Sequence, residues 1–233
     1  MRGALALSLT DLIVPPRCWG CGAVGAEDGL FCEGCAGKVR MLRGADCLRC
    51  GRFLGEHRRP RPCGDCRRGR PYRRAVAWAV YEGPVREALH ALKFQEVEGL
   101  ARLIADRLLE RVRAEPFAAR LDAVTTVPQT LGRLLKPVHP AVWIGRRIAA
   151  GLGRPWRPGL LRRIRGGPPQ RDLGNVERRK NVTGAFEGTA AAAGLRVLLV
   201  DDVMTTGATA EACAAALREA GARGVWIAAA GRS

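Results

Sequence analysis

Short apolar runs alternate with longer amphipathic segments over the last two thirds of the chain. The apolar runs are bounded by turn residues, and they predict strands over 75–81, 121–127, 160–165, 196–200 and 224–229. Apolar residues at helical spacing predict helices over 85–94, 100–113, 140–150 and 210–220. Gly151 and Gly153 are placed to end the third of these helices, and Gly221 the fourth. Strands that alternate with helices in this way indicate an α/β domain with a mostly parallel sheet flanked by helices.

The first 70 residues show no such period and are marked by cysteine instead. Eight of the nine cysteines form four C-x-x-C pairs, which are Cys18/Cys21, Cys32/Cys35, Cys47/Cys50 and Cys63/Cys66. Two pairs make a closed tetrahedral Cys₄ site, the ligand set of a structural rather than a catalytic zinc ion. Disulfides are the alternative, but nothing else in the sequence suggests secretion. The pattern therefore predicts two zinc ribbons, each holding one structural Zn²⁺.

The spacing of the pairs leaves the pairing of the ribbons open. The short loops favour sequential sites, in which neighbouring pairs share one ion, whereas an interleaved cross-brace also satisfies the spacing. A segment of this kind cannot bury much apolar surface, so the metals would supply its folding energy. The ninth cysteine, Cys213, lies in the Ala-rich helix predicted over 210–220 and is interpreted as a small core residue.

Charge adds a hypothesis about partners. The formal net charge is +17, and only four of the 39 basic residues are lysine. High-GC coding would favour arginine without any function, whereas a polyanion partner would exploit the bidentate grip of arginine on phosphate. Arginines are dense around the cysteine pairs. Contact with nucleic acid and a solvated basic scaffold are both compatible with this surface.

The stretch over 197–209 reads V-L-L-V-D-D-V-M-T-T-G-A-T and predicts a ligand site. A buried strand over 197–200 is followed by Asp201 and Asp202, then by a small hydroxyl-rich turn and a helix N-terminus. Ligands of open α/β sheets sit beyond the carboxyl ends of the strands, and helix N-termini bind phosphate. Paired carboxylates can accept hydrogen bonds from ribose hydroxyls or hold Mg²⁺. A Walker B strand is the alternative, but the P-loop that it requires is absent from the sequence.

A second informative stretch, 166–181, is rich in glycine, proline and charge and has no clear period. It predicts a long mobile loop that could close over a phosphate site and exclude water. An exposed linker is the alternative. The candidate lid residues are Gln170, Arg171, Arg178, Arg179, Lys180 and Asn181.

No window of about 20 apolar residues exists, so no membrane span is expected. Residues 1–14 superficially resemble a signal peptide, but Asp11 interrupts them and no small-residue cleavage site follows. We expect a short amphipathic helix there, and a cytoplasmic protein.

The stretch over 197–209 resembles the phosphoribosyl pyrophosphate (PRPP) motif of type I phosphoribosyltransferases. By that resemblance Asp201 and Asp202 would face the ribose hydroxyls, and PRPP would bind together with Mg²⁺. The 5′-phosphate would be held by Thr205, Thr206, Gly207, Ala208 and Thr209. In purine-salvage transferases an Asp stands before the Thr-Gly pair, and Thr205 in that place argues against purine salvage.

Nearly the whole chain resembles the ComF family of competence proteins. The resemblance includes Pro15-Pro16-Arg17-Cys18, the cysteine pairs, Tyr81-Glu82-Gly83-Pro84, Leu92-Lys93-Phe94 and the pattern from Gln170 to Phe186. It implies a helix and double zinc ribbon over 1–70 and a type I phosphoribosyltransferase fold over 71–233. It also implies PRPP binding and a role in DNA uptake, with single-stranded DNA and other competence proteins as partners.

One segment departs from the family pattern. After Val127-Pro128 the family usually ends a basic stretch with Arg-Gly-Phe-Asn-Gln, where this chain has 137–141, P-V-H-P-A. The loop after this strand contacts pyrophosphate in type I transferases, and Arg133 and Lys136 remain there as basic candidates. We therefore expect PRPP to bind and to turn over slowly or not at all. An active phosphoribosyltransferase with an unidentified acceptor is the alternative.

Overall fold

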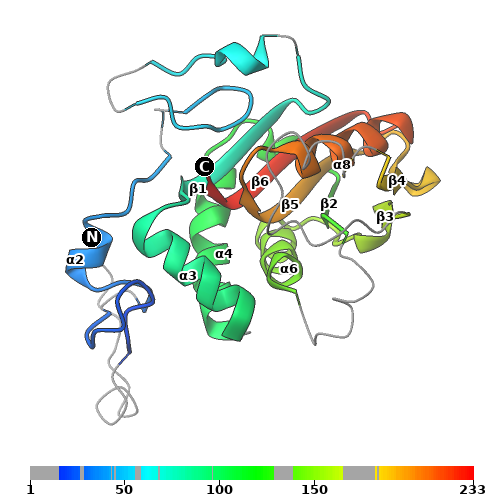
Figure 1. Cartoon of the computed structure of the whole chain (residues 1–233). Helices are drawn as coiled ribbons and strands as arrows, with labels where there is room; N and C mark the ends of the chain where they lie inside the picture. Colours follow the sequence, from blue (N-terminus) through cyan, green and yellow to red (C-terminus); the bar gives the residue numbers. More distant parts are fainter. Residues whose placement is uncertain are drawn as a thin grey trace.

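The computed structural model describes residues 16–26, 29–42, 44, 46–55, 59–67, 69–95, 97–128, 139–164, 182 and 184–233. The helix predicted over 1–14 lies outside these residues. The chain beyond residue 70 forms a parallel sheet with helices on both faces, which confirms the predicted class (Figure 1).

Four strands make the main sheet, in the order β1-β6-β5-β2, and every neighbouring pair is parallel. They are β1 (Arg74–Val80), β2 (Ala123–Thr126), β5 (Arg196–Met204) and β6 (Gly224–Arg232). Their side chains are almost all buried, as expected of a parallel sheet covered on both faces. Three helices pack on one face, α3 (Gly83–Gln95), α4 (Glu98–Arg113) and α6 (Pro140–Leu152), whereas α8 (Ala208–Glu219) packs on the other.

Three short 3₁₀ turns and a small second sheet complete this part of the fold. The turns are η2 (Ala118–Arg120), η3 (Pro158–Leu160) and η5 (Ala190–Ala192). The strand predicted over 160–165 was expected in the main sheet, and this is wrong. Strand β3 (Leu161–Arg163) pairs antiparallel with β4 (Phe186–Gly188) instead, because the main sheet already ends at β2 on that side.

Of the two glycines predicted to end α6, Gly153 does so and Gly151 does not. Gly153 caps the helix in the left-handed conformation, at φ 61°. Gly151 lies inside the helix, where a Cβ would clash with the side chain of Leu109 of α4. Gly151 therefore permits close packing of the two helices rather than ending one of them.

The two cysteine-rich segments lie on different sides of the sheet. The first ribbon, from Cys18 to Cys35, contains α2 (Glu33–Ala36) and packs into the core formed with α3 and α4. The second ribbon, from Cys47 to Cys66, contains η1 (Gly64–Cys66) and packs into the core that contains α8. Figure 1 shows the first ribbon beside α3 and the second above β1. The boundary near residue 70 stays a prediction, since each ribbon shares a core with the sheet.

The second ribbon is tied to the sheet through main-chain and charged contacts. Ala75 of β1 donates its N–H to the Arg49 carbonyl at 2.7 Å, and a Cβ on Gly51 would meet the Ala75 oxygen at 2.9 Å. Asp46, at the start of this ribbon, is buried, and its carboxylate lies 3.5 Å from Arg74 and 3.8 Å from Arg111. Close backbone approach and buried charge therefore fix its position.

Candidate functional sites

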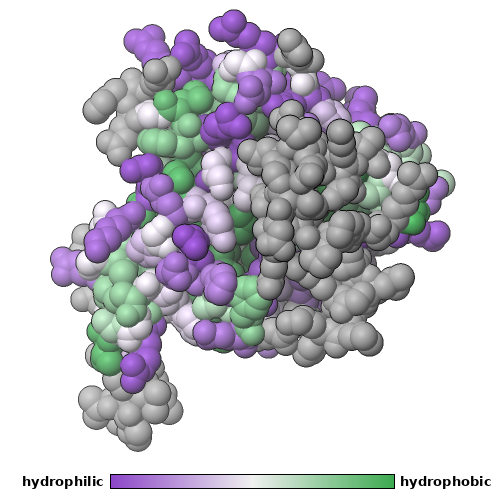
Figure 2. All heavy atoms as spheres, viewed as in Figure 1, coloured by the Kyte–Doolittle hydropathy of each residue, from purple (hydrophilic) through white to green (hydrophobic). Residues whose placement is uncertain are grey.

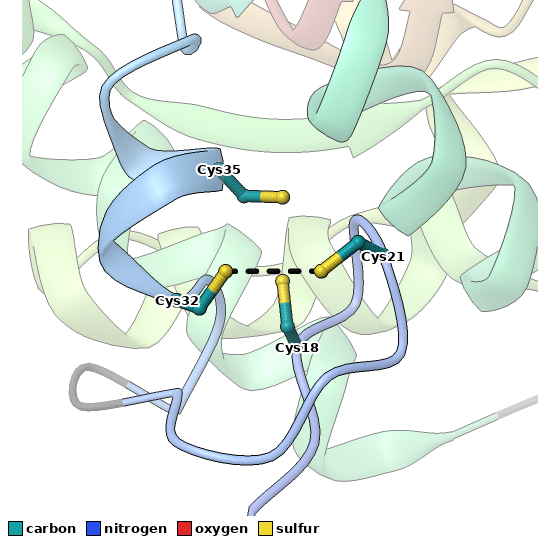
Figure 3. Close-up of side chains that lie close together, drawn as sticks. All are labelled: Cys18, Cys21, Cys32 and Cys35. Carbon is teal, nitrogen blue, oxygen red and sulfur yellow. Dashed lines mark hydrogen bonds between the residues drawn. The ribbon is translucent and has the colours of Figure 1, made fainter.

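The first four-cysteine cluster draws its ligands from a knuckle and from the start of α2. The sulfurs of Cys18, Cys21, Cys32 and Cys35 all lie within 4.8 Å of one another and converge on one point (Figure 3). Burial raises the pKa of the Cys18 thiol, but main-chain N–H donors, including that of Gly20, outweigh it and lower the value to about 6. Such a thiol is readily deprotonated for metal binding.

The second cluster repeats this design with more hydrogen bonds to one sulfur. Its ligand atoms, those of Cys47, Cys50, Cys63 and Cys66, also lie within 4.8 Å of one another. The Cys47 sulfur accepts from the N–H groups of Arg49, Cys50 and Cys63 at 3.2–3.5 Å. Burial raises the pKa of the Cys47 thiol, and these donors bring it down to about 7.

Both clusters fit Zn²⁺ on geometric grounds. Zinc–sulfur bonds of about 2.3 Å place the corners of a tetrahedron about 3.8 Å apart. The Cys21 and Cys32 sulfurs are 3.7 Å apart, and those of Cys50 and Cys63 are 3.8 Å apart. All nine cysteines are free, so the disulfide alternative is wrong. The pairing is sequential, as the short loops favoured, and the interleaved arrangement is wrong.

The ligand edge predicted over 197–209 lies at the carboxyl end of the parallel sheet. Strand β5 leads through a tight turn into α8 on one face, whereas the chain after β2 leads to α6 on the other face. Adjacent strands whose connections leave to opposite faces form a switch point, where ligands of open α/β sheets bind. Asp201 and Asp202 were expected just after the strand, and this is wrong. They lie inside β5, because pairing with β6 continues as far as Met204.

The turn after β5 presents main-chain donors. Gly207 caps α8 in a left-handed conformation, at φ 83°, which side chains rarely adopt. The Thr206 hydroxyl accepts from the Ala208 N–H at 3.3 Å, and the Glu211 N–H bonds to the Gly207 carbonyl at 2.8 Å. Thr205 is exposed, and Thr206 and Thr209 are half-buried. The N-terminus of α8 thus has hydroxyls beside it, as an anion site requires.

The acidic pair is electrostatically strained. Burial, and then the neighbouring charge of Asp202, raise the pKa of the Asp201 carboxyl well above its ordinary value, against an opposing effect of Lys93. The main-chain N–H groups of Asp202 and Val203 bond to the two carboxylates at 3.0 and 2.8 Å. A cation placed here would relieve the repulsion between the carboxylates.

Two residues of this edge were not predicted as site residues. Lys93 of α3 lies close enough for its charge to act on Asp201. Tyr81 follows β1, and burial is the first cause that raises the pKa of its hydroxyl, with Asp202 among the others. Their signal was in the sequence: Tyr81 is the last residue of a predicted strand, and Lys93 is one of only four lysines.

Other candidates are described only in part. The six lid residues and the basic candidates Arg133 and Lys136 lie outside the described residues. His139 is described, and its Nδ1 accepts from the Ala141 N–H at 3.2 Å as the cap of α6. This contact gives His139 a structural role at the start of that helix.

A cavity of about 360 Å³ lies beside α8 and is lined by residues that include Phe186 and Glu211.

The second ribbon carries a basic surface. Arg59, Arg61 and Arg67 are exposed, whereas Arg52 pairs with Asp65 at 3.0 Å. Figure 2 shows hydrophilic side chains along the outer rim of the molecule above the sheet, where this ribbon lies.

Among the described residues, no helix has the length and apolar character needed to cross a membrane.

Comparisons with known proteins agree with this architecture. Residues 9–67 match the double zinc ribbon domain family. The chain is 30% identical over 222 residues to DNA utilization protein YhgH of Salmonella typhi. This similarity covers 93% of this chain and 96% of that protein. It is 26% identical to Competence protein F of Haemophilus influenzae, covering 87% and 90%.

Solved structures give weaker likenesses. The glutamine PRPP amidotransferase of B. subtilis is 25% identical with a TM-score of 0.38, over 55% of this chain and 26% of that chain. An adenine phosphoribosyl transferase from Trypanosoma brucei is 16% identical with a TM-score of 0.37, over 66% and 70%.

The full-length relatives decide the assignment, because their similarity spans both the ribbons and the sheet. The predicted fold class, a type I phosphoribosyltransferase fold with an N-terminal double zinc ribbon, agrees with the parallel sheet, its flanking helices and the two cysteine clusters. The chain therefore belongs to the ComF family, together with Competence protein F and DNA utilization protein YhgH.

Proposed function

We propose that this chain binds PRPP with Mg²⁺ at the carboxyl edge of its sheet and acts in DNA uptake through contact with single-stranded DNA. One observation carries the PRPP half: two acidic residues inside the second half of β5 are followed by a hydroxyl-rich turn and the N-terminus of α8. This arrangement offers anionic acceptors and amide donors on a single short segment.

The chemistry of PRPP matches that segment part by part. The 5′-phosphate would accept from the N–H groups and hydroxyls of Thr205–Thr209. The ribose diol would donate to Asp201 and Asp202, and these carboxylates are also suited to Mg²⁺, which prefers oxygen ligands. A bound cation would favour the ionised form of Asp201, which burial disfavours in its absence. Binding should therefore be tighter with Mg²⁺ and weaken as the pH falls.

The DNA half rests on the basic surface of the second ribbon and on the relatives, whose names refer to DNA utilization and competence. Because few aromatic residues lie in the ribbon sequence, its exposed arginines should contact phosphates and show little sequence preference. A cytoplasmic location and other competence proteins as partners belong to the same proposal.

The first experiment measures PRPP binding by calorimetry with Mg²⁺. The wild-type chain should bind, and Asp202→Asn should weaken binding because a charged acceptor is lost. Thr206→Val should weaken binding independently through the phosphate. Arg147→Gln, which changes an exposed ion pair with Asp106 on α4, is the matched control and should bind like wild type. Absence of binding by the wild-type chain would overturn the PRPP proposal.

The second experiment measures single-stranded DNA binding against salt. Affinity should fall by roughly 0.7 log units per log unit of salt for each phosphate neutralised. The triple variant Arg59→Ala/Arg61→Ala/Arg67→Ala should reduce both affinity and slope, with Arg147→Gln again as control. A flat salt dependence would contradict the proposal.

The alternative function is transfer of ribose 5-phosphate to an unidentified acceptor. A bond from the acceptor to C1 of PRPP would form with inversion as the C1–oxygen bond breaks and pyrophosphate leaves. The observation in its favour is the complete segment from Asp201 to Thr209. Losing one charged contact to departing pyrophosphate slows transfer by about a hundredfold or more. Pyrophosphate release near background with candidate bases would support the binding protein, and brisk release would support the enzyme.

A further inference from the structure

Arg232, the last residue of β6, connects the second ribbon to the turn after β5. It is 2% exposed. Its Nη1 donates to the main-chain oxygens of Met204, at 3.0 Å, of Thr205 and of its neighbour Ser233. Its Nε donates to the Cys50 carbonyl at 3.1 Å. A single buried side chain therefore spans a zinc knuckle and the start of the candidate phosphate turn.

Sheet register explains why this residue reaches both. Arg232 pairs with Met204 of β5 on one side and with Val80 of β1 on the other. The second ribbon packs against β1 through Gly51, directly after Cys50. Ala75, which Gly51 contacts, pairs with Ile227 of β6, five residues before Arg232, so the Arg232 side chain reaches back along the sheet to bond the Cys50 carbonyl.

A second link holds the other end of the turn. Arg70 follows the last cysteine pair and forms an ion pair with Glu211 in the first turn of α8. Its other nitrogen, Nη2, donates to the Asp65 carbonyl at 3.2 Å. Glu211 in turn donates its N–H to the Gly207 carbonyl. The second ribbon is therefore linked through Arg232 to the entry to the turn, at Met204 and Thr205, and through Arg70 to Glu211 in the first turn of α8.

Charge makes these links depend on metal. A zinc ion with four thiolates carries a net charge of −2. Arg232 bonds the Cys50 carbonyl and Arg70 lies beside the Cys66 thiol, so the negative charge of this centre would offset the desolvation of both guanidinium groups. Among the described residues of the first ribbon no side chain makes a comparable link, and its close contact is between Gly20 and Pro84 of α3, on the other side of the sheet.

We propose that Arg232 is a positioning residue through which the second metal centre, and not the first, holds the turn over 205–209 in its anion-binding conformation. The ligand part of this proposal rests on the proposed function, but the order of the turn can be measured without any ligand. A failure of PRPP binding and a failure of the coupling are therefore distinguishable.

The test compares one ligand substitution in each ribbon of the full-length chain. Cys63 and Cys32 are both half-buried and both open the second pair of their cluster. Cys63→Ser should release one Zn²⁺ and raise the amide hydrogen exchange of residues 204–210 by about tenfold or more, which corresponds to about 1.4 kcal/mol of lost local stability. Cys32→Ser should also release one Zn²⁺ but raise exchange only in the first ribbon. Equal exchange at 204–210 in the two variants would overturn the proposal.

A second set of variants tests Arg232 itself while both metals stay bound. Arg232→Met removes the donors, and Arg232→Lys retains the charge with a shorter reach. Amide exchange at 204–210 should rise most in Arg232→Met and less in Arg232→Lys. The affinity for Mg²⁺-PRPP should fall most in Arg232→Met and less in Arg232→Lys. If Arg232→Met does not fold, Arg70→Gln replaces it in the test. This substitution removes the less buried ion pair with Glu211 and should also raise amide exchange at 204–210. Unchanged exchange in folded variants with two Zn²⁺ would contradict the role of Arg232.

Discussion

The two zinc ribbons have the same ligand chemistry but different relations to the rest of the molecule. The first ribbon contributes apolar side chains to one core, where Phe31 stacks on Trp78 of β1 at a ring distance of 6.3 Å. The second is joined to the sheet through main-chain contacts at Gly51 and through the buried donors of Arg232. One ribbon is attached by burial of apolar surface, and the other by directional bonds that reach the candidate ligand edge.

That difference indicates that a repeated metal module need not have a repeated role. Apolar contacts are non-directional, so they attach a module without fixing distant atoms to a fraction of an ångström. Hydrogen bonds from a buried guanidinium have a defined geometry and therefore transmit position. The second ribbon is suited to order a neighbouring loop, whereas the first is suited to cover the sheet.

The largest expected effect is on metal release. Structural zinc contributes roughly 10–16 kcal/mol to the folding of small zinc domains, so losing either ion should unfold its ribbon. Cys21 of the first cluster is exposed, whereas three ligands of the second are buried. A chelator should therefore remove the first ion faster. A difference of about 1.4 kcal/mol between the free-energy barriers to exposing the two ions corresponds to about tenfold in rate.

Zinc release followed with a metal-sensitive dye should show two phases, and Cys21→Ser should lack the fast one. Thermal unfolding measured after each phase should show a separate loss of stability at each step, because each ion holds its own ribbon. A single phase would mean that the two centres are equivalent.

The next effect separates the two modes of attachment. Phe31 is 4% exposed, so Phe31→Ala should lower the free energy of unfolding by about 3–5 kcal/mol. Phe53 of the second ribbon is half-buried beneath the Arg40 guanidinium, and Phe53→Ala should lower it by only about 1 kcal/mol. Urea unfolding of both variants checks the contrast, and similar losses would contradict it.

Two glycines in equivalent places allow a matched comparison of backbone approach. Gly22 and Gly51 each follow a cysteine pair with positive φ, but only Gly51 would bring a Cβ against the sheet. Gly22→Ala should lower stability by about 1–2 kcal/mol through strain alone. Gly51→Ala adds a contact of 2.9 Å with the Ala75 oxygen and should lower stability by about 1–3 kcal/mol more.

The readout for this pair is thermal unfolding with zinc content as the control. Both variants should retain two Zn²⁺, because neither substitution touches a ligand. If the two glycine variants lose the same stability, the close approach of the second ribbon to β1 does not contribute to the free energy of unfolding.

The smallest expected effect concerns charge at the edge beside the second ribbon. The pKa of Asp201 is raised in the folded chain, so its ionisation above the ordinary value of 3.8 disfavours folding. Asp201→Asn should raise stability at pH 7 by on the order of 1 kcal/mol, or about 2–4 °C in Tm. The gain should shrink as the pH falls toward 3.8, where the carboxyl becomes protonated in both states.

Asp106→Asn is the control on the other face of the sheet. It removes an exposed ion pair with Arg147 and should lower stability by no more than about 1 kcal/mol. Thermal unfolding of both variants between pH 4 and 8 makes the comparison. A loss of stability in Asp201→Asn at pH 7 would show that the carboxylate is stabilised by its surroundings.

Much of the molecule was predictable from sequence because the signals are local. Apolar periodicity located β1, β5, β6 and the four long helices to within a few residues. The C-x-x-C spacing identified both metal clusters, since a tight turn that aims two sulfurs at one ion is a property of adjacent residues. The candidate ligand stretch was likewise visible as one continuous segment ending in the N-terminus of α8.

What the sequence by itself determined, then, is the kind of each part: two zinc-binding ribbons, an α/β sheet and an acidic, hydroxyl-rich turn. Only the tertiary structure decided how the parts meet. It separated the ribbons onto different cores, moved β3 into its own sheet with β4, and placed Arg232 between Cys50 and Thr205. These relations join residues far apart in the chain, and they depend on strand order and register, which no local pattern of residues encodes.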